Sequence, residues 1–423
     1  MYIYFLLIRI AALCGHKKAQ MLVKGQRETL KQRTTELNAL RGCVWFHAAS
    51  VGEFEQARPM IERLKREHPE KKIVVTFFSP SGYEMRKNYN LADGVFYLPF
   101  ATRSNAKRFI EALRPSMAIF VKYEFWPAYL KELKKRSIPT YCISAIFRPK
   151  QRFFRWYGGA SRKLLKCFTH IYVQDERSEK LLKDHGISSC SVAGDTRFDR
   201  VVNNSQCTMH NAQFTEELGL IERFVEGCER VVVAGSTWPE DEKLLEAYIQ
   251  VQRDDVQCTM HNAQCTKGQC KLILVPHEID EAHLHFIFNL FQGRYVRYTR
   301  ATATALIHAD VLIIDTMGLL STIYRYGHAA YVGGGFGEGI HNTIEPAAFG
   351  RPVVFGPNYH HFREAQGLID AGAGKSVKNY RELAAAMDYA LDNHRELGDK
   401  AYQYVASEIG ATEKIYQDLF GHS

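Results

Sequence analysis

The chain has 423 residues, of which 46% are hydrophobic and 24% charged. This is typical of a folded protein of two or three domains and excludes an intrinsically disordered one. Its formal net charge of +9 favours anionic partners. No RNA-binding signature accompanies that charge, so nucleic acid is not an expected partner.

The first 34 residues join an apolar stretch to a basic one. Residues 2–14 are apolar except for Arg9, and six Lys or Arg residues follow between Lys17 and Arg33. A helix over 2–14 reaches roughly 20 Å, less than the roughly 30 Å of a hydrocarbon core. The pattern favours a helix lying on, or inserting shallowly into, the cytoplasmic face of an anionic membrane. The alternative is a core helix followed by a solvated basic tail.

From residue 43 onward, short apolar runs alternate with amphipathic stretches. We expect strands at 43–49, 72–78, 95–98, 117–121, 140–143, 170–174 and 191–193, with helices at 54–67, 106–113 and 128–135. After a polar break at 202–213, strands are expected at 231–234, 271–275, 311–314, 330–332 and 352–355. The alternation predicts an α/β fold with two doubly wound, Rossmann-like domains and a ligand cleft between them.

The ten cysteines are scattered, and most lie in apolar contexts, which indicates reduced thiols on the cytosolic side. The octapeptide QCTMHNAQ occurs twice, at 206–213 and 257–264, and pairs Cys207 with His210 and Cys258 with His261. These residue types can bind zinc, but the spacing matches no standard finger. Two identical polar octamers also fit loop insertions.

A glycine-rich turn lies between the strands expected at 330–332 and 352–355. Five of the seven residues at 333–339 are glycine, which lets the backbone approach a ligand closely. A helix expected to open at Asn342 as N-cap would point its free N–H groups and dipole at this turn. Such a corner suits a phosphate group; a plain tight turn is the alternative.

Further candidates lie directly after strands, where ligands bind in open α/β sheets. Glu53 follows Ser50 in a Ser-x-x-Glu pattern, so it is either a helix cap or a general base toward a hydroxyl. Glu124 lies among aromatic residues after the strand at 117–121, and Arg197 places a cation after the strand at 191–193. The second half contributes a larger set at its strand ends: Ser236, Thr237, His277, Glu278, Met317, Gly318, Asn342 and Glu345.

The blocks HAASVGE (47–53), YEFWP (123–127), GDTRFD (194–199), AGST (234–237), DTMG (315–318) and HNTIEPAAFGRPVVFGP (341–357) occur in this order. Together they resemble those of the 3-deoxy-D-manno-octulosonic acid (Kdo) transferases, the glycosyltransferases of lipopolysaccharide inner-core assembly. The resemblance covers roughly residues 40 to 375. It implies a GT-B fold, CMP-Kdo as donor substrate, a lipid A precursor (lipid IVA) as acceptor, and neither a cofactor nor a catalytic metal.

The same resemblance implies roles for single residues. Glu53 matches the general base, and Glu124 and Arg197 match residues that stabilise the transition state. Arg197 stands where the family usually has lysine, and Leu319 where it usually has an acidic residue. The implied CMP contacts also include Met317, Gly318, Leu319, Asn342, Thr343, Ile344 and Glu345, beside His277 and Glu278. Attack opposite the departing phosphate implies inversion at the anomeric carbon.

We expect four segments: a membrane-associating N-terminus at 1–34, an acceptor-side domain at 35–205, a CMP-sugar-binding domain at 206–395, and a C-terminal helix at 396–423 that packs on the first domain. The expected location is the cytoplasmic side of the inner membrane, anchored or peripheral through the N-terminal segment. Two other functions remain open: a GT-B enzyme that uses a UDP-sugar, as transferase or epimerase, and a non-catalytic membrane-associated nucleotide-binding protein.

Overall fold

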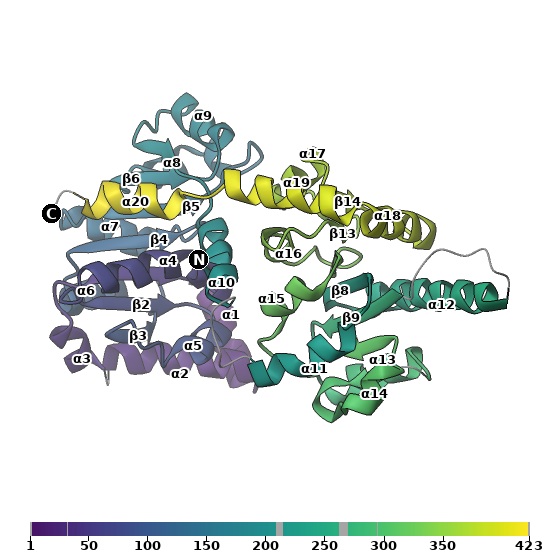
Figure 1. The fold of residues 1–423 in the computed structure, drawn as a ribbon. Helices are drawn as coiled ribbons and strands as arrows, with labels where there is room; N and C mark the ends of the chain where they lie inside the picture. The colour runs from purple at the N-terminus through teal and green to yellow at the C-terminus, as the bar shows by residue number, and fades with distance from the viewer. Residues whose placement is uncertain (1, 32, 209–214, 262–269, 294, 422–423) are drawn as a thin grey trace. The chain divides into compact units, whose positions relative to one another are not determined.

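The computed structural model describes residues 2–31, 33–208, 215–261, 270–293 and 295–421. The chain divides into two compact units: unit 1 comprises residues 1–200 and 408–423, and unit 2 comprises residues 201–407. Each unit contains one sheet with helices on its faces (Figure 1).

The sheet of unit 1 is parallel, with strand order β3-β2-β1-β4-β5-β6-β7. Its strands are β1 (Val44–Ala48), β2 (Ile73–Phe77), β3 (Gly94–Tyr97), β4 (Met117–Val121), β5 (Thr140–Ala145), β6 (His170–Val173) and β7 (Cys190–Val192). Its helices are α1 (Tyr2–Leu13), α2 (Lys17–Lys31), α3 (Thr34–Ala39), α4 (Val51–Glu67), α5 (Pro80–Arg86), α6 (Arg103–Leu113), α7 (Pro127–Lys135), η1 (Arg152–Phe154), α8 (Gly159–Leu165), α9 (Glu176–Asp184) and α20 (Ala411–Phe420).

Alternate residues of these strands enter two separate cores, because successive side chains of a strand point to opposite faces. Trp45 and Phe120 pack with α6, α7 and the N-terminal helices on one face. Phe46 and Ile119 pack with α4 and α20 on the other. Burial on both faces explains why these strands read as continuous apolar runs.

Unit 2 repeats this architecture with the parallel order β10-β11-β9-β8-β12-β13-β14. Its strands are β8 (Arg230–Thr237), β9 (Cys270–Pro276), β10 (Tyr295–Arg297), β11 (Val311–Ile313), β12 (Ala329–Val332), β13 (Val353–Phe355) and β14 (Gly374–Ser376). Its helices are α11 (Thr215–Val225), α12 (Pro239–His261), α13 (Glu281–Leu290), η3 (Tyr298–Arg300), α14 (Ala303–Ile307), α15 (Leu320–Ile323), η4 (Tyr324–Tyr326), α16 (Ile344–Ala348), α17 (Arg363–Asp370), α18 (Tyr380–Asp392) and α19 (His394–Ser407). The predicted α/β class with two parallel sheets is confirmed.

The secondary structure of two connections between the halves differs from what we expected. The polar stretch at 202–213 was expected as a break, but helix α10 (Thr196–Thr208) runs through its first part and contains the division between the units. Phe198, Val201 and Val202 bury an apolar face of this helix, which outweighs the polar composition that follows. The segment 396–423 was expected as one helix, but α19 ends at Ser407 in unit 2 and α20 lies in unit 1, after Gly410 with φ +112°.

The N-terminal helices belong to unit 1 and have two faces. Phe5, Leu22 and Leu30 lie in the core, and α2 approaches β3 so closely that a Cβ on Gly25 would meet the Tyr97 ring at 2.2 Å. On the opposite face of α1, large apolar side chains are exposed: Ile3, Tyr4, Leu6, Leu7, Ile10 and Leu13. None of the described helices has both the length and the hydropathy that crossing a bilayer requires.

Candidate active site

Glu53 lies in the first turn of α4, directly after β1, and it makes the contacts of a helix cap. Ser50 stands at the N-cap with extended backbone, and its hydroxyl accepts from the Glu53 N–H at 3.4 Å. The Glu53 carboxylate accepts from the Ala49 N–H at 2.6 Å. The Ser-x-x-Glu pattern is therefore used as a cap, and this use fixes the carboxylate at the carboxyl end of β1.

The surroundings of Glu53 also suit a base. Burial raises the pKa of the Glu53 carboxyl to about 7, and the charge of Glu124 adds to the rise, while the Ala49 N–H and the Lys122 ammonium oppose it. A base with a pKa near the working pH is both deprotonated and strong enough to take a proton. Capping and proton transfer are compatible at this residue.

Glu124 is held beside it by donors from two aromatic residues. The carboxylate Oε2 lies 3.1 Å from Nε2 of the buried His47 and accepts from Trp126 Nε1–H at 2.5 Å. His47 Nδ1 lies 2.9 Å from the Thr76 hydroxyl, which accepts from Trp45 Nε1–H. His47 Nδ1 also lies 3.1 Å from the Thr76 carbonyl oxygen, and His47 Nε2 lies 3.0 Å from Trp126 Nε1, so polar contacts hold both ring nitrogens of His47.

Because β1 and β4 are neighbours, Glu53 and Glu124 follow adjacent strands, and the structure brings these two predicted residues together. The charge of Lys122, directly after β4, opposes the rise in the pKa of Glu53 and contributes to the lowered pKa of Asp195. The sequence prediction gave no role to His47, although it stands inside a quoted motif, and it included Lys122 only in the strand-end segment around Glu124.

Arg197 forms an ion pair with Asp195 at the start of α10. Asp195 accepts from Arg197 Nε at 2.9 Å and Nη2 at 2.7 Å, and from Gln56 Nε2 at 2.9 Å. Burial opposes ionisation of Asp195, but the Arg197 charge and its hydrogen bonds outweigh it, so the pKa of Asp195 is lowered. Gln56 is on the same helix as Glu53, which ties this ion pair to the carboxylate site.

Three of the five non-glycine residues with positive φ among the described residues lie at strand ends. Lys122 (φ 54°), Ser144 (φ 52°) and Ser236 (φ 54°) are non-glycine residues in the left-handed region, at or next to the ends of β4, β5 and β8. Such conformations persist where the surrounding structure enforces them, and they are concentrated at functional sites.

In unit 2, the glycine turn at 333–339 packs backbone against backbone. A Cβ on Gly333 would meet the Ser236 carbonyl oxygen at 2.3 Å, and one on Gly335 would meet the Gly356 backbone at 2.6 Å. The Gly334 N–H donates to the Asp241 carboxylate at 2.9 Å. This N–H group of the turn is therefore already hydrogen-bonded within the protein. Asp241 was not foreseen as a partner of the glycines.

The helix expected to open at Asn342 as N-cap starts one residue later, because Thr343 is the N-cap of α16. Helix α16 has five residues, so its dipole is small. Asn342 Oδ1 does accept from the Ile344 N–H at 3.1 Å, and Asn342 Nδ2 donates to Glu345 at 3.0 Å. Thr343 and Ile344 are buried. The Asn-x-x-Glu block thus makes local hydrogen bonds at the start of its own short helix, with Glu345 half-buried.

The other predicted donor-site residues lie around a stack of aromatic rings. His277 is exposed and stacks at 4.3 Å on His341 and at 4.8 Å on Trp238, whose Nε1 lies 3.2 Å from His341 Nε2. Burial and the neighbouring His277 lower the pKa of His341 to about 4, so it is neutral at pH 7. Glu278 is exposed beside the stack. Trp238 and His341 were not singled out from the sequence.

Thr237 and residues 317–319 differ from one another in how exposed their side chains are. Thr237 is buried and its hydroxyl donates to Glu242 at 2.9 Å. Met317 is 69% exposed, Gly318 has φ +93°, and Leu319 is 6% exposed within the core. Burial of Leu319 explains an apolar residue at this position, and it leaves the Leu319 backbone, not its side chain, for contact with a ligand.

The zinc hypothesis on Cys207, His210, Cys258 and His261 falls on side chains outside the described residues. Among the residues that are described, no group of three or more His, Cys, Asp or Glu side chains is placed to hold a metal ion.

Comparisons with known proteins agree with the motifs. A family profile described as 3-deoxy-D-manno-octulosonic-acid transferase (kdotransferase) matches residues 24–200. The chain is 28% identical over 367 residues to the 3-deoxy-D-manno-octulosonic acid transferase of Aquifex aeolicus, which covers 85% of this chain and 89% of that protein. It is 25% identical over 391 residues to that of Haemophilus influenzae, covering 88% and 85%.

Solved structures support the fold. The UDP-GlcNAc 2-epimerase of Neisseria meningitidis, bound to UDP-GlcNAc, superposes with a TM-score of 0.62 at 16% identity over 89% of this chain and 99% of that one. A putative UDP-N-acetylglucosamine 2-epimerase of Listeria monocytogenes gives 0.59 at 16% identity over 90% and 96%. These likenesses confirm an α/β fold of two doubly wound domains. The chain thus matches the Kdo transferase profile over residues 24–200, and over most of its length it is similar to proteins named 3-deoxy-D-manno-octulosonic acid transferases.

Proposed function

We propose that this protein transfers Kdo from CMP-Kdo to a hydroxyl of a lipid A precursor (lipid IVA), with inversion at the anomeric carbon, in lipopolysaccharide biosynthesis. The observation that carries the proposal is Glu53, a carboxylate with a raised pKa at the carboxyl end of β1, within a chain whose relatives are named Kdo transferases.

In the proposed reaction, Glu53 accepts the proton of the acceptor hydroxyl while that oxygen attacks the anomeric carbon of Kdo. The bond from that carbon to the CMP phosphate breaks, and CMP leaves with the electron pair. Glu53 ends protonated. A carboxyl with a pKa near 7 returns this proton to solvent between turnovers.

Glu124 and Arg197 are proposed to stabilise charge in the transition state. His47 and Trp126 fix Glu124, and Asp195 fixes Arg197. Preorganised charges of this kind need no reorganisation as the reaction proceeds. We propose no metal and no cofactor besides the donor substrate itself.

CMP is proposed to bind unit 2 through Ser236 and Thr237, His277 and Glu278, the 317–319 segment and the 342–345 block. The aromatic stack of Trp238, His277 and His341 supplies a flat, partly exposed surface at the strand ends. Glu345, half-buried at the start of α16, is proposed to accept hydrogen bonds from ribose hydroxyls.

The protein is proposed to work at the cytoplasmic face of the inner membrane, attached through α1. The exposed apolar face of α1 and the cations of α2 support this, since an amphipathic segment with basic flanks binds anionic bilayers. Nucleic acid is not a proposed partner.

The direct test is incubation of the purified protein with CMP-Kdo and lipid IVA, followed by mass spectrometry of the lipid. The expected product is heavier by one or more Kdo residues and CMP is released. Thermal shift separates the UDP-sugar alternative: CMP, and not UDP, should raise Tm, since a ligand stabilises the native state that it binds. Stabilisation by UDP alone, without Kdo transfer, would contradict the proposal.

A further inference from the structure

A pocket of about 670 Å³ opens between α1, α2, the segment after β3 and α6. This volume is in the range of small-molecule sites. Its lining residues are Arg9, Ala12, Leu13, Gln20, Val23, Lys24, Gln26, Arg27, Leu30, Lys31, Pro99, Phe100, Asn105 and Arg108. None of them is among the residues described for the candidate active site.

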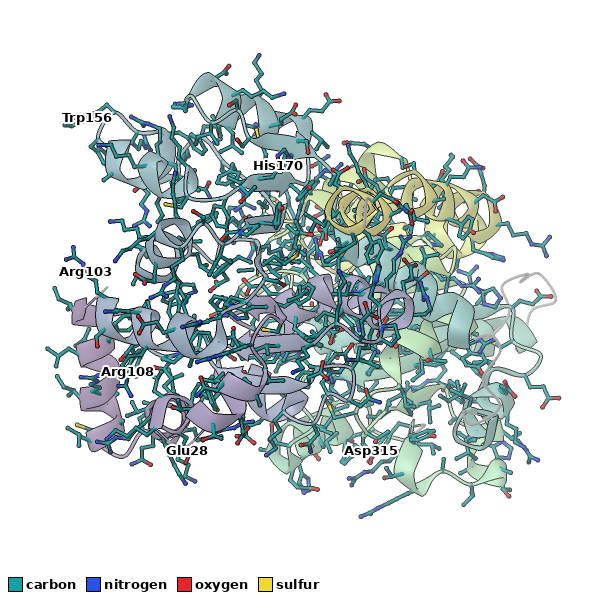
Figure 2. All side chains as sticks on the ribbon, turned by 90° about the vertical axis from the view of Figure 1, so that its left-hand side faces the viewer. Glu28, Arg103, Arg108, Trp156, His170 and Asp315 are labelled. Atoms are coloured by element: carbon teal, nitrogen blue, oxygen red, sulfur yellow. The ribbon has the colours of Figure 1, made fainter. Side chains whose placement is uncertain are left out.

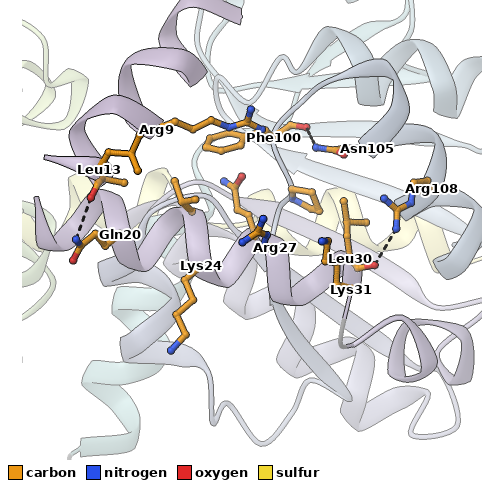
Figure 3. A pocket seen from close by; sticks show the side chains of 14 residues that line it. Arg9, Leu13, Gln20, Lys24, Arg27, Leu30, Lys31, Phe100, Asn105 and Arg108 are labelled. Atoms are coloured by element: carbon orange, nitrogen blue, oxygen red, sulfur yellow. Dashed lines mark hydrogen bonds between the residues drawn. The ribbon is translucent and has the colours of Figure 1, made fainter. Parts of the chain in front are cut away.

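The charge of the pocket is one-sided, because its lining has five Lys or Arg residues and no acidic one. Figure 3 shows Arg9 and Arg108 at opposite ends with Arg27 and Lys31 between them, whereas Lys24 extends away. Arg108 Nη2 donates to the Leu30 carbonyl oxygen at 3.3 Å, and the Arg9 guanidinium lies 5.5 Å from the centre of the Phe100 ring. These contacts hold two of the cations in place, as an anion site requires.

Gln26 gives a second, independent indication of a ligand. Its residue is only 3% exposed and lines the pocket, yet neither Nε2 nor Oε1 has a hydrogen-bond partner in the protein. Burying an amide without partners costs free energy. The Nε2–H can donate to a phosphate oxygen while Oε1 accepts from a hydroxyl, so the side chain matches a phosphate ester with a hydroxyl nearby.

The apolar side of the pocket continues onto the exposed face of α1. Leu13 both lines the pocket and is 87% exposed, and Val23, Leu30 and Phe100 complete an apolar wall. Unit 1 also exposes other aromatic residues, such as Trp156 at its outer edge (Figure 2). Among the described residues, Trp156 has no buried amide without hydrogen-bond partners beside it.

We propose that this pocket binds the headgroup of one anionic glycerophospholipid, with its phosphate on Arg27, Lys31 and Arg108, a headgroup hydroxyl on Gln26, and its acyl chains along the apolar face of α1. The proposal builds on the proposed membrane attachment and adds to it a stoichiometric lipid site. It does not depend on the identity of the sugar donor.

Dihexanoyl phosphatidylglycerol, used below its micelle concentration, tests for a pocket and not merely for a charged surface. Calorimetric titration of the full chain should give saturable binding of one lipid per chain. Dihexanoyl phosphatidylcholine, glycerol 1-phosphate and inorganic phosphate should each bind at least about tenfold more weakly, because each lacks either the net charge and hydroxyls or the acyl chains.

Matched variants locate the site. Gln26→Leu removes the amide at similar size without changing charge, and should weaken the lipid about tenfold while leaving the ligand-free Tm equal or higher. The pair Arg27→Gln and Lys31→Gln should weaken it further. The control pair Lys17→Gln and Lys18→Gln removes the same charge from the same helix outside the pocket, and should leave binding of monomeric lipid within about twofold.

Absence of saturable binding, an equal loss in the control pair, or unchanged binding by Gln26→Leu would each overturn the proposal. Equally tight binding of inorganic phosphate would also overturn it, in favour of a free-phosphate site. Kdo transfer is assayed separately, so a negative lipid titration with an active enzyme refutes the lipid site and leaves the proposed function standing.

Discussion

Replacing Glu53 with Gln separates its capping role from its role as a base. The amide oxygen of Gln can still accept from the Ala49 N–H, so α4 keeps its cap. An amide is not a base at neutral pH, so kcat should fall by about 10²–10⁴, the usual contribution of general base catalysis. CMP affinity should not change, because the proposed CMP contacts all belong to unit 2.

The pKa of Glu53 gives the same prediction a pH signature. With a folded pKa of about 7, the wild-type rate should fall about tenfold per pH unit below pH 7 and level off above it. The residual rate of Glu53→Gln should lose this inflection. Radiolabelled or mass-detected Kdo transfer between pH 5.5 and 8.5 measures both profiles.

Stability supplies the control for folding. The folded pKa of Glu53 lies above its ordinary value of 4.5, so the stability contributed by this group is full below pH 4.5 and is lost as pH rises through 7. Above pH 7 its charge destabilises the fold by at most about 3 kcal/mol. Glu53→Gln removes that charge and should raise Tm at pH 8.

Glu62→Gln is the matched control, since Glu62 lies on the same helix in a half-buried ion pair with Arg58 and should keep full activity. If well-folded Glu53→Gln transfers Kdo at more than about a tenth of the wild-type rate, with the wild-type pH profile, Glu53 is a cap and not the base.

Glu345→Ala should weaken CMP binding by about 1–3 kcal/mol, measured calorimetrically, if a buried hydrogen bond to ribose is lost; unchanged affinity would leave Glu345 as a cap. Arg197→Gln should cost about 3–5 kcal/mol in urea unfolding at pH 7, because it strands the buried carboxylate of Asp195, and the deficit should vanish in the double variant with Asp195→Asn if the ion pair is the cause. Exchanging the exposed Leu6 and Leu7 for Ser should release the protein from sedimenting bilayer vesicles while CMP affinity holds; full sedimentation of this variant in high salt would refute attachment through α1.

The central strands were predictable because they are buried on both faces and therefore read as continuous apolar runs. Strands such as β4 match their predicted bounds. The edge strands β10 and β14 were missed, since Tyr295–Arg297 is only half-buried and Gly374–Ser376 has no apolar run. A short edge strand leaves too little hydrophobic signal in the sequence.

The candidate site was predictable where motif residues follow strands that pair in the sheet. Glu53 and Glu124 lie together for this reason. His47 was missed as a partner of Glu124 because it lies inside β1, where a buried histidine reads as part of the core. Asp241 was missed because its hydrogen bond with Gly334 joins residues 93 positions apart in the sequence. A local sequence pattern cannot predict such a contact. The roles of these residues in transfer remain predictions.

Phe5 connects α1 to the candidate active site through a ring contact with Trp126. Its ring stacks at 6.4 Å on Trp126, which donates to Glu124. One face of α1 therefore contacts the tryptophan that holds the Glu124 carboxylate, while the other face of α1 is exposed. Trimming α1 would remove one of the three rings that contact Trp126, beside Phe78 and His47, whereas exchanging the outward-facing leucines of α1 would leave all three in place.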